Sequence, residues 1–348
     1  MPKQRAEAVE YCSEVVPMSV TEKSRFVAFL EKHNQETWNK ILDSLLPSLH
    51  EVDRMATRIW FSFWPLELNE ALRGQLGAEE MARIMDLEGQ WHLENQIDSS
   101  VGFLYGAKYW STVKKAVLSH AESAEQADGT PLGEQIRGVA RKVAEREGIE
   151  ESVVVGITAV AFMVLQQVGM EELTRVADRP AEGGSYRRSA DEVARRRKKK
   201  REGGFIARLQ GAGRKYKIVW DEKNGKGFKA IHGEDLASAA ARVDGDFLPL
   251  DYRRSQGPVP VECRIGSCGY CWVGVIEGKD NLSELTDHEK KRLQYFGYDQ
   301  ASDLSDRKPP VRLACQTQCQ GDAILVIPPW NGELKRRFDK TRDKLGTV

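Results

Sequence analysis

Three closely spaced cysteines near the C-terminal end constrain the fold of this chain more than any other feature. Cys263, Cys268 and Cys271 follow the spacing C-x4-C-x2-C, and Cys315 comes from a distant part of the sequence. Clustered cysteines in a chain without a secretory signal are typical of a metal centre rather than of disulfides. The fold must therefore bring Cys315 next to a tight loop that already carries three thiols.

Four thiolates at this spacing are the ligand set of a [2Fe–2S] cluster. Zinc also binds four cysteines, but usually through two C-x2-C pairs, and here only Cys268 and Cys271 are so spaced. We predict one [2Fe–2S] cluster as the cofactor, with Cys263, Cys268, Cys271 and Cys315 as its metal ligands.

The residues between these cysteines are small. Gly266 and Gly269 permit left-handed or tight backbone conformations without steric cost, and Ser267 adds little bulk. Such conformations can point several backbone N–H groups at the cluster sulfurs, which also helps to set the reduction potential. We expect Gly266, Ser267 and Gly269 to form the backbone cradle of the cofactor.

The similarity to a known family extends beyond the cysteines. It includes Cys-Trp-Val-Gly-Val-Ile-Glu-Gly at 271–278, Asn-Leu-Ser at 281–283 and Arg-Leu-Ala-Cys-Gln at 312–316. On these motifs, residues 214–330 resemble a plant-type [2Fe–2S] ferredoxin domain, about a third of the chain. The resemblance implies a β-grasp fold.

Cys319 is a second candidate for the fourth ligand, because it lies four residues after Cys315. Cys315 has the family-like context at 312–316, whereas Cys319 precedes a strand predicted at 323–327. We therefore assign ligation to Cys315, under the usual rule of four thiolates.

Length and charge indicate two domains. The 348 residues are enough for two cores. Residues 1–180 are acidic, with 19 Lys and Arg against 28 Asp and Glu. Residues 181–202 are basic, with 9 against 4, and residues 203–348 are mildly basic, with 24 against 20. We predict an α+β protein with an all-α helical bundle at 1–180, a basic flexible linker at 181–204, a [2Fe–2S] ferredoxin-like β-grasp domain at 205–332 and a basic tail at 333–348.

The N-terminal half has the apolar period of helices. Apolar residues recur at spacings of three and four, and strand-like alternation is nearly absent. We predict helices at 21–49, 52–64, 79–87, 91–120, 132–147 and 151–176. Glu88 and His92 have the spacing of di-iron bundle ligands, but the required second unit is missing, so we interpret them as ordinary surface or core residues.

The predicted linker contains seven consecutive cations at 195–201. Such a run resists packing, and we expect it to stay solvated. Nucleic-acid binding is the alternative, but no aromatic residues interleave the cations, so we expect no nucleic-acid partner.

The C-terminal half should hold strands at 215–220, 228–231, 272–276 and 323–327, with helices at 236–243 and 285–296. Asn224-Gly225 predicts the first hairpin. Residues 248–260 form a longer connection to the cysteines than the resemblance leads us to expect.

A [2Fe–2S] centre moves single electrons, while the protein supplies binding and tuning. We predict an electron carrier, not an enzyme, that works between a reductase and an acceptor redox enzyme. The helical domain would serve docking or assembly, and either a homo-oligomer or a hetero-oligomer formed through this domain is open at this point. No Gly-x-Gly-x-x-Gly follows a predicted strand, and no catalytic residues are evident.

Two alternatives remain open at this point, a redox-sensing regulator and a structural subunit of a larger redox complex. The N-terminus lacks an apolar signal region, and the longest apolar run, 153–165, is too short to cross a bilayer. We expect a soluble cytoplasmic protein.

Overall fold

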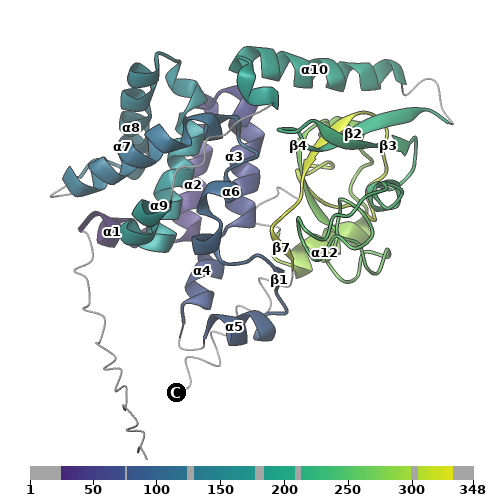
Figure 1. The fold of residues 1–348 in the computed structure, drawn as a ribbon, viewed down its shortest axis with the longest axis horizontal. Coiled ribbons are helices and arrows are strands. Elements are labelled where there is room, and N and C mark those ends of the chain that lie inside the picture. Colours follow the sequence, from purple (N-terminus) through teal and green to yellow (C-terminus); the bar gives the residue numbers. More distant parts are fainter. Residues whose placement is uncertain are drawn as a thin grey trace, which may run out of the picture.

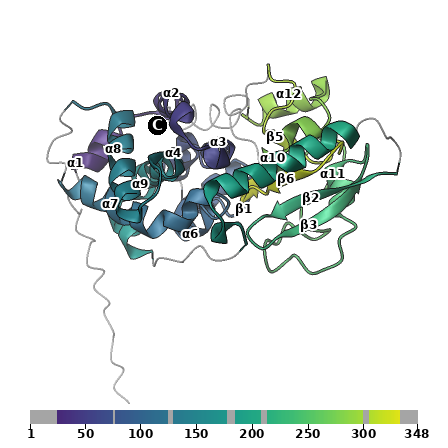
Figure 2. The ribbon, with the colours of Figure 1, turned by 90° about the horizontal axis from the view of Figure 1, so that it is seen from above.

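The computed structural model describes residues 25–74, 77–123, 129–176, 184–207, 213–298 and 305–331. Within them a helical region, residues 25–207, packs beside a mixed α/β region, residues 213–331 (Figures 1 and 2). The predicted tail at 333–348 lies outside the described residues. None of the described helices is long and apolar enough to span a membrane.

Helices make up the helical region, as the apolar period predicts, and this confirms the fold class expected for the N-terminal half. The α-helices are α1 (Arg25–Leu30), α2 (Gln35–Leu45), α3 (Glu51–Phe63), α4 (Leu66–Leu72), α5 (Ala78–Ile84), α6 (Ile97–Ser100), α7 (Trp110–Ser123), α8 (Leu132–Glu147), α9 (Val155–Arg175) and α10 (Ala190–Ala207). Short 3-10 turns are η1 (Leu46–Ser48), η2 (Leu93–Asn95), η3 (Tyr105–Tyr109), η4 (Glu151–Val153) and η5 (Gly184–Arg187). The buried helix α9 lies at the centre, against α3, α7 and α8.

The helix predicted at 91–120 is wrong in its first half, because the long helix α7 begins only at Trp110. Before it, the buried carboxylate of Asp53 accepts hydrogen bonds from the backbone N–H groups of Tyr105 and Gly106, both at 2.6 Å. These bonds satisfy the backbone without a continuous helix.

A five-stranded mixed sheet forms the C-terminal region, in the order β3-β2-β6-β4-β5. Its strands are β2 (Lys215–Asp221), β3 (Lys226–Ile231), β4 (Trp272–Glu277), β5 (Val311–Leu313) and β6 (Ala323–Val326). Strands β2 and β6 are parallel, and the other pairs are antiparallel. Helix α11 (Leu236–Ala240) contacts β3, whereas α12 (Asp287–Tyr295) and η6 (Lys279–Asn281) lie in the connection between β4 and β5. The predicted α+β class is confirmed.

The two regions share one apolar core. Helix α3 packs directly on β4, where a Cβ on Gly274 would lie 2.7 Å from Ile59 Cγ2. The indole N–H of Trp330 donates to the carbonyl oxygen of Phe63 at 2.6 Å. The short strands β1 (Glu88–Gly89) and β7 (Trp330–Asn331) pair antiparallel, one from each region. The helical region therefore forms part of the structure that supports the sheet.

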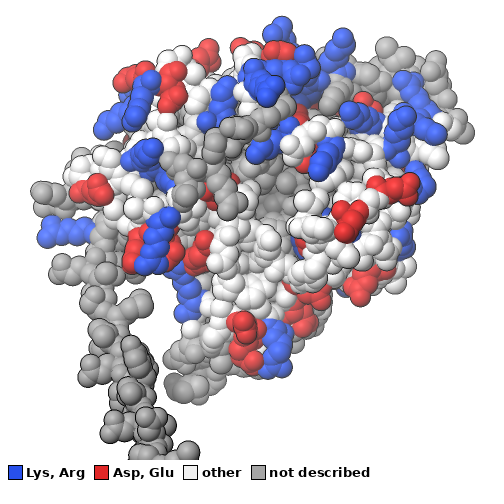
Figure 3. All heavy atoms as spheres, in the orientation of Figure 1, with Lys and Arg blue, Asp and Glu red and all other residues white. Residues whose placement is uncertain are grey.

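The prediction of a flexible linker at 181–204 is wrong for residues 190–204, which are part of helix α10, and the expected solvation is wrong at Arg197. Arg197, within the run of cations, is buried, and its guanidinium binds Glu222 Oε2 at 2.5 Å as well as the carbonyl oxygen of Val52. Glu222 directly follows β2 and Val52 lies on α3, so the residues around Arg197 in the sequence give no sign of either partner. The neighbouring Arg195 and Arg196 remain exposed, and Figure 3 shows basic side chains gathered along the top of the molecule, where Figure 1 places α10.

Candidate metal centre

The structure brings the four predicted cysteine ligands together as two pairs of thiols. The thiols of Cys263 and Cys268 are close enough for each to shift the pKa of the other, and the same holds for Cys271 and Cys315. The backbone N–H of Cys315 donates to Cys271 Sγ at 3.5 Å. The distant segment therefore meets the loop 263–271, here called the cysteine loop, as the spacing requires.

Backbone N–H groups of the cysteine loop point at its own sulfurs. The N–H groups of Ser267 and Cys268 each donate to Cys263 Sγ at 3.4 Å, and the N–H of Tyr270 donates to Cys268 Sγ at 3.4 Å. Burial alone would raise the pKa of the Cys263 thiol, but the hydrogen bonds from Ser267 and Cys268 outweigh it and lower the pKa to about 6. The loop thus favours a thiolate at this position before any cofactor is considered.

Glycine is needed at two turns of the cysteine loop. Gly266 and Gly269 have φ angles of +74° and +70°, in the left-handed region. A Cβ on Gly269 would lie 2.4 Å from the ring of Phe296, and a Cβ on Gly266 would lie 3.0 Å from the side chain of Gln316. Neighbouring side chains therefore close tightly over both turns.

Helix α12 holds the cysteine loop from one side. The Arg292 Nε donates to the carbonyl oxygen of Gly266 at 3.1 Å, and its terminal nitrogen bonds the carbonyl oxygen of Ser267. His288 Nε2 lies 3.1 Å from the carbonyl oxygen of Ile265. Because these carbonyl groups are held toward α12, the N–H groups between them are left to face the sulfurs. Sequence reasoning did not identify either side chain, since both come from a separate helix.

The segment that carries Cys315 is fixed by a buried ion pair. Arg312 binds the Glu289 carboxylate through Nε and a terminal nitrogen at 2.9 and 2.8 Å, and both side chains are at most 1% exposed. The same carboxylate accepts the backbone N–H of Leu313 at 2.9 Å. Helix α12 is thus tied to the cysteine loop and also to the strand that leads to Cys315.

Cys319 stands apart from the two thiol pairs. It is fully buried, and its thiol donates to the carbonyl oxygen of Gly321 at 3.3 Å. Burial raises the pKa of this thiol to about 12, so it stays protonated. Its backbone bonds Gly233 and Glu234 at the end of the β3 hairpin.

The residues present fit a binuclear cluster. Two pairs of thiols match two irons with two thiolates each. The hydrogen bonds to Cys263, Cys268 and Cys271 supply the N–H dipoles that stabilise anionic sulfur.

Comparison with known proteins decides the family. Residues 238–320, which include both thiol pairs, match the family described as 2Fe-2S iron-sulfur cluster binding domain. A ferredoxin of Bacillus thermotolerans is 33% identical over 104 residues, which cover 30% of this chain and 67% of that protein. Through its C-terminal region, this chain belongs to the 2Fe-2S ferredoxin family. The ferredoxin region binds a [2Fe–2S] cluster, and this confirms the predicted cofactor. No solved structure matches the chain.

One edge of the ferredoxin's cysteine loop is open to solvent. Ile265 is 67% exposed, and Tyr252 of the unexpected connection 248–260 is 61% exposed. The Tyr252 hydroxyl accepts the backbone N–H of Gly89 at 2.8 Å, and burial together with the nearby Glu88 raises the pKa of the Tyr270 hydroxyl of the loop. Glu88 therefore lies in a strand that supports the loop, not on a helix face shared with His92.

Proposed function

We propose that this ferredoxin is an electron-transfer protein whose single cluster is held by Cys263, Cys268, Cys271 and Cys315. The observation that carries the proposal is the meeting of two thiol pairs within a shell of inward N–H groups. A [2Fe–2S] cluster accepts and donates one electron at a time when bound. The chain supplies thiolates, hydrogen bonds and a buried side, while the open edge at Ile265 gives partners an approach.

The proposed partners are a reductase that delivers electrons and an acceptor enzyme that consumes them. The helical region would contribute to docking or assembly, because it packs against the sheet of the ferredoxin region and leaves the edge at Ile265 accessible. Electrostatic steering by complementary charges would raise the rate of encounter with such partners.

One-electron reduction tests the carrier function. Anaerobically prepared protein should take up one electron per chain at a reduction potential of about −400 mV. It should show an electron paramagnetic resonance signal only after reduction. It should then return the electron to an added acceptor protein. A cluster that is present but accepts no electron from any low-potential donor would instead support a structural subunit, and reduction-dependent binding to nucleic acid would support a regulator.

Serine substitutions test the ligand set. Cys315→Ser should lower the iron content and the visible absorbance of the purified protein strongly, because a hydroxyl replaces one of four thiolates. Cys319→Ser is the matched control, since Cys319 is buried away from the thiol pairs and should keep its cluster. Equal cluster loss in the two variants, or greater loss in Cys319→Ser, would contradict the assignment.

A further inference from the structure

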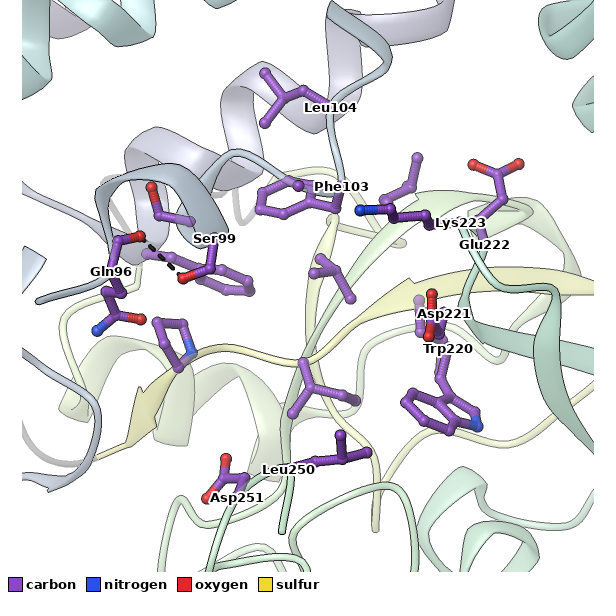
Figure 4. A pocket seen from close by; sticks show the side chains of 18 of the residues that line it. Gln96, Ser99, Phe103, Leu104, Trp220, Asp221, Glu222, Lys223, Leu250 and Asp251 are labelled. Atoms are coloured by element: carbon purple, nitrogen blue, oxygen red, sulfur yellow. Dashed lines mark hydrogen bonds between the residues drawn. The ribbon is translucent and has the colours of Figure 1, made fainter. Parts of the chain in front are cut away.

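A cavity of about 300 Å³ lies where the helical region meets the ferredoxin sheet. Its floor is formed by β4 and β6 residues such as Ile276 and Leu325, and its walls come from the segment 96–105 and from the end of β2 with the connection that follows α11 (Figure 4). This volume is at the lower end of the range for small-molecule sites in proteins, which is roughly 300–1,000 Å³.

Aromatic and aliphatic side chains line the middle of the cavity. Phe103 and Leu250 lie at opposite ends of the lining in Figure 4, and Trp220 lies nearer to Leu250. Trp64 contributes another ring from the helical region. Flat aromatic molecules pack well between such surfaces, because offset and edge-on ring contacts add to apolar burial.

The acidic side chains at the cavity already have hydrogen-bond donors. Glu222 accepts two bonds from Arg197, at 2.5 and 3.2 Å. The Asp251 carboxylate is bound by Arg253, from its Nε at 3.0 Å and from a terminal nitrogen at 2.5 Å.

The remaining acid, Asp221, accepts the side-chain amide of Asn224 at 2.7 Å and its backbone N–H at 3.1 Å. All three carboxylates therefore have partners within the protein.

Two cations, Arg254 and Lys223, also line the cavity. The Nε of Arg254 is buried and has no hydrogen-bond partner among the described residues, and its contact with Asp251 is long, at 3.8 Å. Its guanidinium lies 5.6 Å from the ring centre of Trp220, and Lys223 lies 5.9 Å from that of Tyr186. The Arg254 side chain is 14% exposed, and no hydrogen bond joins its guanidinium to another described residue. An anionic group in the cavity would therefore be stabilised by charge-assisted hydrogen bonds to the accessible part of this guanidinium.

We propose that this cavity binds a small aromatic carboxylate, with its rings against the apolar lining that includes Phe103 and Leu250 and its carboxylate at Arg254. The proposal is independent of electron transfer, because no residue of the thiol pairs lines the cavity. A ligand there would contact both regions of the protein at once, and it would therefore stabilise their association by mass action.

Calorimetric titration of the full-length protein with its cluster bound tests the proposal with two probes of similar shape. The probes are 2-naphthoate and the neutral 2-naphthalenemethanol. We expect one binding site, with 2-naphthoate about ten- to a hundredfold tighter, as a charged hydrogen bond gives. Arg254→Gln should remove most of this preference and leave binding of the alcohol unchanged, whereas Phe103→Ala should weaken both probes.

Arg214→Gln is the matched control, because Arg214 also lies over an aromatic ring, that of Tyr216, but does not line the cavity. It should leave both affinities unchanged. Absence of binding up to about 1 mM, equal affinity for the two probes, or equal weakening by Arg254→Gln and Arg214→Gln would overturn the proposal. Retained binding of the alcohol by Arg254→Gln shows that this variant is folded.

Discussion

Glu289 fixes the segment that carries Cys315. Its carboxylate is fully buried, pairs with Arg312 through two hydrogen bonds, and accepts the N–H of Leu313 just before the turn that carries Cys315. A buried ion pair of this kind gives little net stability over an apolar replacement, but removing one partner leaves an uncompensated buried charge.

Glu289→Gln should therefore destabilise the protein by about 3–5 kcal/mol, because Arg312 stays buried without its counter-charge. Denaturant unfolding followed by far-ultraviolet circular dichroism measures this loss. Glu284→Gln is the control, since the Glu284–Arg307 pair is 49% and 78% exposed and should contribute at most about 1 kcal/mol. Similar losses in both variants would mean that the buried pair has no special role.

Asp53 predicts a pH dependence of stability. Burial raises the pKa of this carboxyl from 3.8 to about 6, although the N–H groups of Tyr105 and Gly106 and the charge of Arg197 oppose the shift. Because the folded-state pKa is raised, the stability that this group contributes is present at low pH and is lost as the pH rises through about 6.

Between about pH 5 and about pH 7.5, the wild-type protein should therefore lose about 1 kcal/mol relative to Asp53→Asn, which has no charge to bury. Denaturant midpoints of the two proteins at each pH measure the difference, and Asp43→Asn replaces an exposed carboxylate as the control. A constant difference across this range would show that Asp53 does not titrate there.

At the scale of elements, the contact between α3 and β4 joins the two regions. Gly274 lies on β4 where a side chain would collide with Ile59 and approach Phe63, both on α3. The absence of a Cβ thus sets how closely this helix approaches the sheet. Overpacking of a closely packed interior usually costs about 1–3 kcal/mol.

Gly274→Ala should destabilise the protein by about that amount, as measured by the denaturant midpoint at constant slope. Gly138→Ala is the control, because nothing lies within 4 Å of a Cβ at this position inside α8. It should raise stability by about 0.5–1 kcal/mol through helix propensity. If Gly274→Ala were as stable as the wild-type protein, the helix would have room to move away from the sheet.

The elements that sequence reasoning predicted well are those whose signal is local. The cysteine spacing, the Asn224-Gly225 hairpin and the apolar period of α8 each depend on residues a few positions apart. The elements it missed depend on distant partners. The cations of α10 suggested a solvated linker. The residues near Arg197 in the sequence do not indicate that its guanidinium binds Glu222 and the carbonyl oxygen of Val52.

The candidate site shows the same division. The cysteine spacing predicts the four cysteines and the small residues between them as the site, and the structure places these residues close together. It could not show that Arg292 and Glu289 of α12 would hold the cysteine loop and the Cys315 segment, since charged residues on a short helix usually indicate a solvent-facing surface. Likewise, the cavity at Arg254 exists only because segments from both regions meet there.

For the whole molecule, one continuous core predicts a single unfolding transition. Buried residues of α3 and α9 belong to the same apolar cluster as those of β4 and β6. Heating should therefore abolish helical circular dichroism and the visible absorbance of the cluster at coincident midpoints. Gly138→Ala should move both signals upward together. Two separate midpoints would mean that the helical and ferredoxin regions are independent domains.

Strand β7 has a consequence for the order in which the protein folds. Trp330 and Asn331 follow the ferredoxin sheet in the sequence, yet they supply the partner of β1 and the indole that bonds Phe63. Contacts between residues so far apart in the sequence form late, because closing the long intervening loop costs conformational entropy. The helical region should therefore reach its final packing only after the ferredoxin region has folded beside it.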